Sequence, residues 1–279
     1  MFDKKTTRLH FERAADTYDA SAVLQKEVAN RLSGRLDYIK HSPKTVLDVG
    51  SGTGFITQDL LKRYPKSSIV ALDLAHSMAS KSQQLGGWFR KPLAVCADAE
   101  QLPLKPDSID LIISSLMLQW SNDLKQTFAG FHSVLAPNGL LLFSTLGPET
   151  LREMRESWAT VDNVPHTSHF LDMHEIGDAL LQSGFINPVT DMEMITMTYT
   201  NVRQIMRDIK QIGANNSHSG RSKGLMGKQK LKAFETAYEQ FKTDEGLYPA
   251  TWEVIYGHAW VGEGLKLDNY DHFIPIQKV

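Results

Sequence analysis

A glycine-rich loop carries the clearest chemical signal in the sequence. The segment Asp48-Val49-Gly50-Ser51-Gly52-Thr53-Gly54 lies between a predicted strand and a predicted helix. Its glycines let the backbone turn tightly and let a ligand approach the peptide groups. A phosphate-binding loop is excluded, because Phe55 follows Gly54 where a lysine would be needed. A dinucleotide-binding loop is disfavoured, because the third glycine comes one residue too early.

The loop suits S-adenosylmethionine better than a nucleotide phosphate. This molecule has no pyrophosphate, and its amino acid end carries an ammonium group that a carboxylate such as Asp48 can help hold, directly or through water. The alternative is a tight turn between strand and helix that binds nothing. A glycine loop by itself leaves that alternative open.

Two further acids favour a cofactor site. Asp73 ends the second predicted strand, where an acid accepts hydrogen bonds from a ribose diol in this topology. Asp98 ends the third, where a carboxylate can accept a hydrogen bond from an adenine amino group. Acids at the carboxyl ends of successive parallel strands would meet at one edge of the sheet, where ligands bind. The predicted cofactor-binding residues are Asp48, Gly50, Ser51, Gly52, Gly54, Asp73, Leu74, Met78, Asp98, Ala99, Glu100 and Leu116.

Short apolar runs alternate with helical stretches along most of the chain, and this alternation predicts parallel βαβ units. We expect strands over residues 45–49, 68–73, 93–98, 109–116, 139–143, 189–199 and 252–261. We expect two helices at the start of the chain and further helices over residues 54–64, 77–84, 124–135, 149–159, 173–182, 202–212 and 230–241. The predicted fold class is α/β, with a doubly wound, Rossmann-like, mostly parallel seven-stranded sheet, a helical N-terminal segment and a helical cap.

The same pattern predicts four regions. These are an N-terminal helical segment over residues 1–43, a cofactor-binding core over 44–199, a helical cap insertion over 200–250, and the last strand of the core with a tail over 251–279. A helical piece between the two terminal strands would lie over one end of the sheet.

The composition is typical of a soluble globular chain. Of 279 residues, 42% are hydrophobic and 22% are charged, and the formal net charge of −2 gives no overall positive field for nucleic acid or an anionic membrane. The single cysteine, Cys96, excludes an internal disulfide and an all-cysteine zinc site. The histidines have no spacing typical of a metal site, and the N-terminus lacks the apolar core of a signal peptide. We therefore expect a cytoplasmic protein without a metal.

From about Val46 to Leu142 the sequence resembles the class I S-adenosylmethionine-dependent methyltransferases. The resemblance covers the glycine loop, both later acids and the turn at Pro137-Asn138-Gly139, where asparagine replaces the usual first glycine. The flanking segments resemble the malonyl-[acyl-carrier protein] O-methyltransferase family of biotin synthesis. The segments that carry this second resemblance are Phe11–Asp19, Leu118–Trp120, Gly147–Glu153, Ile212–Asn216, Gly224–Gly227 and Pro249–Trp260.

The second resemblance implies transfer of a methyl group from S-adenosylmethionine to the free carboxylate of a malonyl thioester, the step that begins pimeloyl synthesis. A carboxylate with a pKa of roughly 3–4 is already ionised at pH 7, so no general base is required. Arg152 is the expected clamp for the anionic acyl end, although a surface arginine would have the same sequence context. The expected substrate-binding residues are Tyr18, Gln119, Trp120 and Arg152.

The resemblance also implies malonyl-[acyl-carrier protein] as the partner, and such carriers are acidic. Basic residues concentrate in the predicted cap, where they would steer an acidic partner unless they form an ordinary solvated helix face. They are Arg203, Arg207, Lys210, Arg221, Lys223, Lys228, Lys230 and Lys232. RNA is a weaker candidate, because aromatic residues do not alternate with these charges.

Two other functions remain open on the sequence alone. The first is a methyltransferase for another small molecule, such as a quinone precursor or a free acid, which would keep the cofactor site and change the cap. The second is a respiratory complex I assembly factor with this fold, which would act on a protein partner and which resembles the same Leu-Gln-Trp and Pro-Ala-Thr segments.

Overall fold

The computed structural model describes residues 2–88, 90–162, 164, 166, 170–212 and 227–263. Within these residues one seven-stranded sheet has the order β3-β2-β1-β4-β5-β7-β6, and only β7 runs antiparallel to its neighbours. The strands are β1 Thr45–Val49, β2 Ser68–Asp73, β3 Leu93–Cys96, β4 Ile109–Ser115, β5 Leu135–Leu146, β6 Ile186–Tyr199 and β7 Tyr248–Trp260. The predicted α/β class with a mostly parallel seven-stranded sheet is confirmed.

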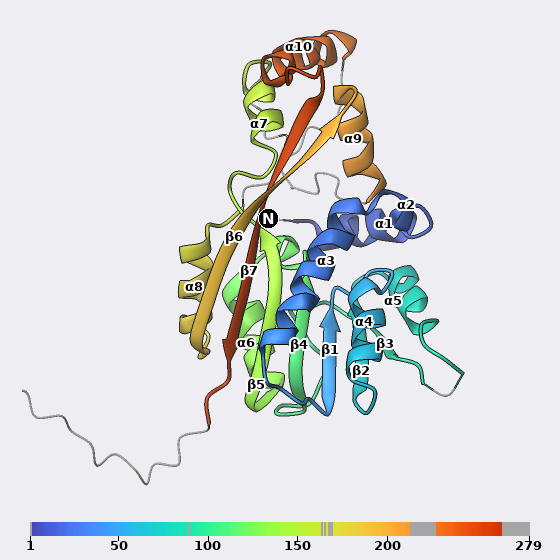
Figure 1. Ribbon diagram of the computed structural model, residues 1–279, viewed down its shortest axis with the longest axis vertical. Helices are drawn as coiled ribbons and strands as arrows, with labels where there is room; N and C mark the ends of the chain where they lie inside the picture. Colours follow the sequence, from blue (N-terminus) through green and yellow to red (C-terminus); the bar gives the residue numbers. More distant parts are fainter. Residues whose placement is uncertain are drawn as a thin grey trace, which may run out of the picture.

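Helices cover both faces of this sheet (Figure 1). The α-helices are α1 Lys4–Ala14, α2 Tyr18–Ser21, α3 Val23–Arg35, α4 Phe55–Arg63, α5 His76–Gln83, α6 Leu124–Val134, α7 Arg152–Ala159, α8 Met173–Gln182, α9 Val202–Gln211 and α10 Lys228–Tyr238. Short 3₁₀ turns are η1 Leu36–Tyr38, η2 Leu118–Trp120 and η3 Glu239–Phe241. Among the described helices, none is long and apolar enough to cross a bilayer.

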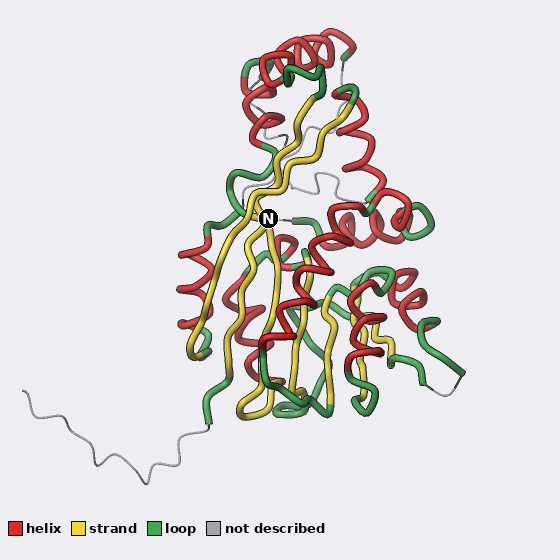
Figure 2. The backbone as a smooth tube through the Cα atoms, in the orientation of Figure 1, coloured by secondary structure: helices red, strands yellow, loops and turns green. Residues whose placement is uncertain are grey.

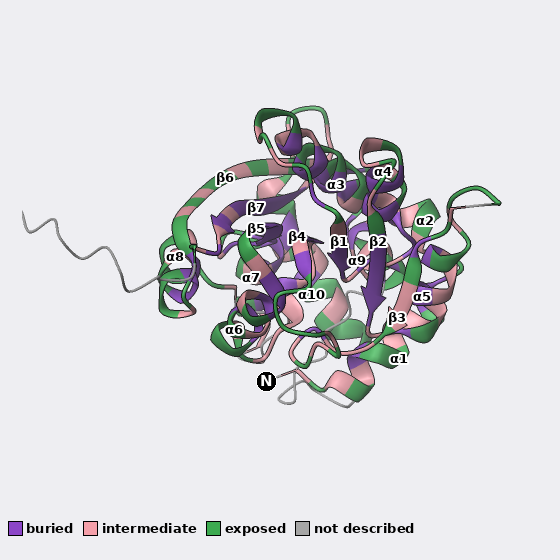
Figure 3. Ribbon diagram, turned by 90° about the horizontal axis from the view of Figure 1, so that it is seen from below, coloured by how far each residue is buried: buried purple, intermediate pink, exposed green. Residues whose placement is uncertain are grey.

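The two faces of the sheet form two hydrophobic clusters. Val46 of β1 packs in the cluster that contains α3 and α4, while its neighbour Leu47 packs in the cluster that contains α6 and α8. This alternation is the period of two that a strand imposes on its side chains. Seen from below, the buried strands lie between helical layers whose outer faces are exposed (Figure 3).

The long pair β6 and β7 extends beyond the carboxyl ends of the parallel strands. Figure 2 shows helices gathered around this extension, and Figure 1 identifies them as α7, α9 and α10. Trp158 of α7 stacks on Phe234 of α10 with ring centroids 4.2 Å apart, and Phe234 in turn contacts Tyr238. The helical elements between β6 and β7 therefore lie at the same edge of the sheet as the predicted cofactor acids.

Several predicted boundaries differ from the structure. β5 begins at Leu135, directly after α6, because Asn138 adopts a positive φ of 61° and the chain passes the Pro-Asn-Gly segment as an irregularity within the strand. β3 ends at Cys96 and leaves Asp98 in the following loop. β6 and β7 begin earlier than predicted, at Ile186 and Tyr248, because they pair with each other over almost their whole length.

Candidate functional site

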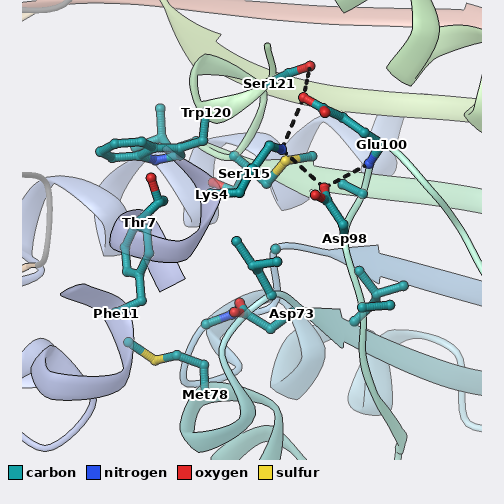
Figure 4. A pocket seen from close by; sticks show the side chains of 18 of the residues that line it. Lys4, Thr7, Phe11, Asp73, Met78, Asp98, Glu100, Ser115, Trp120 and Ser121 are labelled. Carbon is teal, nitrogen blue, oxygen red and sulfur yellow. Dashed lines mark hydrogen bonds and ion pairs between the residues drawn. The ribbon is translucent and has the colours of Figure 1, made fainter. Parts of the chain in front are cut away.

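A pocket opens at the carboxyl ends of β1 to β4, beneath α1 (Figure 4). It holds about 730 Å³ of empty space, a volume that includes open solvent at its mouth. Its lining residues are Lys4, Thr7, Phe11, Tyr18, Gly50, Gly52, Leu72, Asp73, Leu74, Met78, Ala97, Asp98, Ala99, Glu100, Ser115, Leu116, Met117, Trp120 and Ser121.

The structure brings most of the predicted cofactor residues into this pocket. Those that line it are Gly50, Gly52, Asp73, Leu74, Met78, Asp98, Ala99, Glu100 and Leu116. Three others, Asp48, Ser51 and Gly54, do not line the pocket and belong to the strand and loop that carry it. Ser51 accepts a hydrogen bond from Ser82 of α5 at 3.2 Å, which ties the loop to the helix behind it.

The glycine loop needs glycine at its two ends. Gly50 has a φ of 75°, and a Cβ there would lie 2.6 Å from Cβ of Met117. Gly54 has a φ of 97° as the N-cap of α4, and a Cβ there would collide with the side chain of Leu85. Both the left-handed backbone and the close neighbours therefore exclude larger residues. The backbone N–H groups of Gly50 and Ser51 donate to the carbonyl of Leu72, at 2.8 and 3.0 Å.

Asp48 lies beneath the loop with one carboxylate oxygen unused. The residue is 1% exposed; its Oδ2 accepts a hydrogen bond from Thr57 Oγ1 at 2.5 Å, whereas its buried Oδ1 has no partner among the described residues. Burial raises the pKa of Asp48 to about 7, the Thr57 hydrogen bond lowers it, and the nearby Asp73 raises it further. An unsatisfied oxygen under a glycine loop fits a cationic ligand group above it.

Asp73 holds two segments of the pocket together. Its Oδ2 accepts from the backbone N–H of Gly52 and its Oδ1 from that of Ala75, both at 2.8 Å. Burial raises the pKa of Asp73 to about 6, while the hydrogen bonds from the backbone oppose this shift and the Glu12 carboxylate adds to it. Each oxygen has a second lone pair for a ligand hydroxyl.

Asp98 and Glu100 form ion pairs with Lys4 of α1. Nζ of Lys4 lies 3.1 Å from Oδ1 of Asp98 and 3.0 Å from Oε1 of Glu100 (Figure 4). Asp98 Oδ1 also accepts from the backbone N–H of Glu100 at 3.0 Å, so its Oδ2 is the oxygen open to a ligand amine. Lys4 is the one cation among the lining residues, against three carboxylates.

The wall that α1 contributes was not predicted from the sequence. Lys4, Thr7 and Phe11 occupy positions i, i+3 and i+7 of the helix and so share one face, and all three line the pocket. A signal existed in this spacing, but a cation, a hydroxyl and a phenyl ring do not form the apolar stripe that a periodicity search detects.

Two of the four predicted substrate-binding residues line the pocket, and the other two do not. Tyr18 and Trp120 line the pocket. Burial raises the pKa of Tyr18, with further contributions from Asp73 and Asp19, so its hydroxyl stays protonated. Gln119 does not line the pocket; its Nε2 donates to the carbonyl of Leu116 at 2.6 Å.

Arg152 also lies outside the pocket lining, at the start of α7. Its side chain is 49% exposed, and the nearest carboxylates, on Glu149 and Glu153, lie 4.0 and 3.9 Å away. The buried side of α7 is formed by Glu153, Met154, Ser157 and Trp158. Arg152 is therefore turned towards solvent by the helix register.

No cluster of three metal-ligating side chains exists in the described part of the chain. His258 lies on β7, and burial lowers its pKa. His166 stacks on Trp158 with ring centroids 3.9 Å apart, and His169 lies outside the described residues. Nε2 of His166 also lies 2.8 Å from Oδ1 of Asp162, so this histidine both stacks and forms a polar contact.

Comparison with known proteins identifies the family. A family model described as a methyltransferase domain matches residues 47–143. The malonyl-[acyl-carrier protein] O-methyltransferase of Laribacter hongkongensis (strain HLHK9) is 50% identical over 266 residues, which cover 92% of this chain and 89% of that protein. This chain belongs to the malonyl-[acyl-carrier protein] O-methyltransferase family. The resemblance found in its flanking segments is thereby confirmed.

Solved structures agree on the fold of this family member. The YcgJ protein from Bacillus subtilis superposes with a TM-score of 0.58 at 16% identity, over 84% of this chain and all of that one. The [4+2]-cyclase SpnF superposes with a TM-score of 0.54 at 15% identity, over 86% of this chain and 82% of that one. Because a cyclase also has this fold, the reaction has to be argued from the site and the relatives.

Proposed function

We propose that this chain transfers a methyl group from S-adenosylmethionine to the free carboxylate of malonyl-[acyl-carrier protein]. The observation that carries this proposal is the near full-length identity to a protein of that name, joined to an acid-lined pocket at the ends of β1, β2 and β3. S-adenosylmethionine is the methyl donor, and S-adenosylhomocysteine is the product.

The pocket residues fit a donor with a positively charged amino acid end and an adenosyl group. Asp48, with its free Oδ1, and the backbone at Gly50 and Gly52 would hold the amino acid end. Asp73 would accept hydrogen bonds from the ribose hydroxyls, and the open Oδ2 of Asp98 one from the adenine amine. Leu74, Met78, Ala99, Glu100 and Leu116 would complete the walls, with Ser51 and Gly54 shaping the loop behind.

The bound donor supplies an electrophilic methyl group on a sulfonium ion. The acceptor carboxylate is ionised at neutral pH and attacks without a base, so the protein has to align the two partners and exclude water. Alignment alone can lower such a barrier by about 7–11 kcal/mol. The pocket supports this task with the apolar side chains of Phe11, Met117 and Trp120 among its lining residues.

Tyr18 is suited to contact the acyl carboxylate. Its ring stacks on Phe55 with centroids 6.4 Å apart, and its protonated hydroxyl can donate a hydrogen bond without adding charge. Trp120 and Gln119 lie in η2, at the carboxyl end of β4, where the acyl group would enter. Arg152 would contact the acyl end from the rim of the site, as a substrate-selecting cation.

The carrier protein would dock on the helices beyond the sheet edge. Arg207, Lys210, Lys228 and Lys232 are exposed and form no ion pair with a described residue. Arg203 and Lys230 are partly neutralised by Glu235 and Asp162. Arg221 and Lys223 lie outside the described residues. An acidic carrier would meet a local positive surface here, although the whole chain has a net charge of −2.

Mass spectrometry of malonyl carrier protein tests the proposal. After incubation with enzyme and donor, the acyl group should gain the mass of one methyl group, and hydrolysis of the new ester should remove it. Free malonate and a quinone precursor serve as competing acceptors. Transfer to either of these without transfer to the carrier-bound malonyl group would overturn the proposed substrate. Failure to restore growth of a biotin-requiring methyltransferase mutant would point to the assembly-factor function.

A further inference from the structure

The buried hydroxyl group of Thr7, in the wall of the pocket, has no hydrogen-bond partner among the described residues. Thr7 lines the pocket from α1 and is 2% exposed, yet its buried Oγ1 bonds to none of the described residues. Burying a hydroxyl without a partner is unfavourable, and valine has the same shape without that penalty. A threonine at this position is therefore explained by a partner that arrives with a ligand.

The helix itself does not satisfy this hydroxyl. Helical threonines commonly donate to the carbonyl of residue i−3 or i−4. Thr236 of α10 does so, with Oγ1 3.0 Å from the carbonyl of Lys232. In α1 the carbonyl of Asp3 accepts the backbone N–H of Thr7 at 2.8 Å, but the hydroxyl of Thr7 makes no bond to it.

Neighbouring residues of the same helix face hold Thr7 in place. One turn before it, Lys4 pairs with Asp98 and Glu100. One turn after it, Phe11 meets the ring of Trp120 edge-on with centroids 5.4 Å apart. Figure 4 draws Thr7, Phe11 and Trp120 along one side of the pocket and Asp98 and Glu100 along the other, so a ligand would lie between them.

We propose that Thr7 is a donor-binding residue whose hydroxyl hydrogen-bonds the adenosyl group of the bound methyl donor. This proposal rests on the proposed function. We assign the Thr7 hydroxyl to the adenosyl end of the donor because α1 packs against α5 and pairs with Asp98. Both contacts lie on the β2–β3 side of the pocket. The acyl side is marked by Tyr18, which belongs to the proposed acyl-binding residues. Donor binding would then fasten α1 across the pocket, since Thr7 lies on the same face as Lys4 and Phe11.

The test is Thr7→Val, measured by calorimetric titration with S-adenosylhomocysteine, which is not consumed. Loss of one hydrogen bond should raise the dissociation constant about 3- to 10-fold. The unfolding midpoint without ligand should stay the same or rise, because an unsatisfied polar atom has been removed. Thr7→Ser keeps the hydroxyl and should bind within about 2-fold of the unchanged protein. Thr236→Val is the matched control on an exposed helix and should leave binding unchanged.

Three other results would overturn the inference. The first is an unchanged dissociation constant in Thr7→Val. The second is a loss of affinity that Thr7→Ser does not restore, which would indicate a packing effect. The third is a higher KM for malonyl carrier protein at saturating donor with unchanged S-adenosylhomocysteine affinity, which would place the hydroxyl on the acyl side. If the unchanged protein binds no S-adenosylhomocysteine, the proposed function itself fails.

Discussion

The protonation state of Asp73 should control donor affinity. This carboxylate accepts the backbone N–H groups of Gly52 and Ala75 and has lone pairs left for two ribose hydroxyls. Its pKa is about 6, raised mainly by burial, whereas an unperturbed aspartate titrates near 4. Protonation would remove the charge that makes these hydrogen bonds strong. We therefore expect the donor to bind the ionised form.

The sign of the pH effect on binding is opposite to its sign on stability. Below about pH 6 each unit of acidification should raise the donor dissociation constant by up to about 10-fold, because ligand binding then requires loss of a proton. For unfolding, a raised pKa means that the folded chain holds this proton more tightly than the unfolded chain. That contribution to stability is complete below about pH 4 and is lost as the pH rises through 6, with a magnitude of about 3 kcal/mol.

The variant Asp73→Asn separates the carboxylate from the shape of the side chain. An amide keeps one acceptor and loses the charge, so two hydrogen bonds to the ribose should weaken by about 3 kcal/mol together, which corresponds to about 100-fold in the dissociation constant. Calorimetric titration with S-adenosylhomocysteine from pH 5 to pH 8, at constant ionic strength, measures both effects. In the variant the step near pH 6 should disappear, and only the step from Asp48 should remain, at a lower pH than in the unchanged protein because the Asp73 charge no longer raises the pKa of Asp48.

A matched control is Asp178→Asn on the exposed face of α8, which should bind the ligand with the affinity and pH dependence of the unchanged protein. The reasoning fails if the unchanged protein binds S-adenosylhomocysteine equally well at pH 5 and pH 8. It also fails if Asp73→Asn binds within about 3-fold of the unchanged protein at pH 8.

Three further variants probe the acyl site, the docking surface and the loop. Arg152→Ala should raise the KM for malonyl carrier protein by about 10- to 100-fold and leave donor affinity unchanged; an unchanged KM removes Arg152 from the site. Arg207→Glu combined with Lys210→Glu should raise the KM for malonyl carrier protein and reduce its salt dependence. The KM for malonyl-coenzyme A, measured as a control, should not change. Equal effects on both substrates would contradict docking of the carrier on this surface. Gly54→Ala should lower the free energy of unfolding by roughly 1–3 kcal/mol in denaturant titration, whereas Gly177→Ala, which has open space around it, should not.

The strands whose ends are marked by glycine or aspartate could be predicted closely. β1 and β2 match the sequence prediction at both ends, because glycines and aspartates end each apolar run. The ends of β6 and β7 could not be predicted, since their length comes from pairing with each other, from Val189 opposite His258 to Tyr199 opposite Tyr248. Such pairing depends on tertiary contacts that no local window contains.

In the pocket, too, some features follow from local sequence and others depend on tertiary contacts. Its sheet side could be predicted, because a parallel sheet places the ends of its strands at one edge. The wall that α1 contributes could not, because Lys4 reaches Asp98 across 94 positions of sequence. For Arg152 the deciding feature is Glu153, which is 2% exposed and accepts the backbone N–H of Thr251 at 3.1 Å. This anchor fixes the inward face of α7 and leaves Arg152 outside, which the residue types alone do not indicate.

Methyl transfer from a sulfonium ion to a carboxylate cancels two charges at once. Asp48 and Asp73 favour a positive ligand, and the part of their attraction that acts on the sulfonium is lost when the product becomes a neutral thioether, whereas the ammonium group of the product stays charged. The acceptor presents the converse problem, since a strong buried cation would stabilise the reactant carboxylate more than the transition state. Tyr18, kept protonated by its surroundings, offers a neutral hydrogen bond inside the pocket, whereas the cation of Arg152 is half exposed and lies outside the pocket lining. This arrangement allows selection of an anionic acyl group without deep stabilisation of its charge at the reacting oxygen.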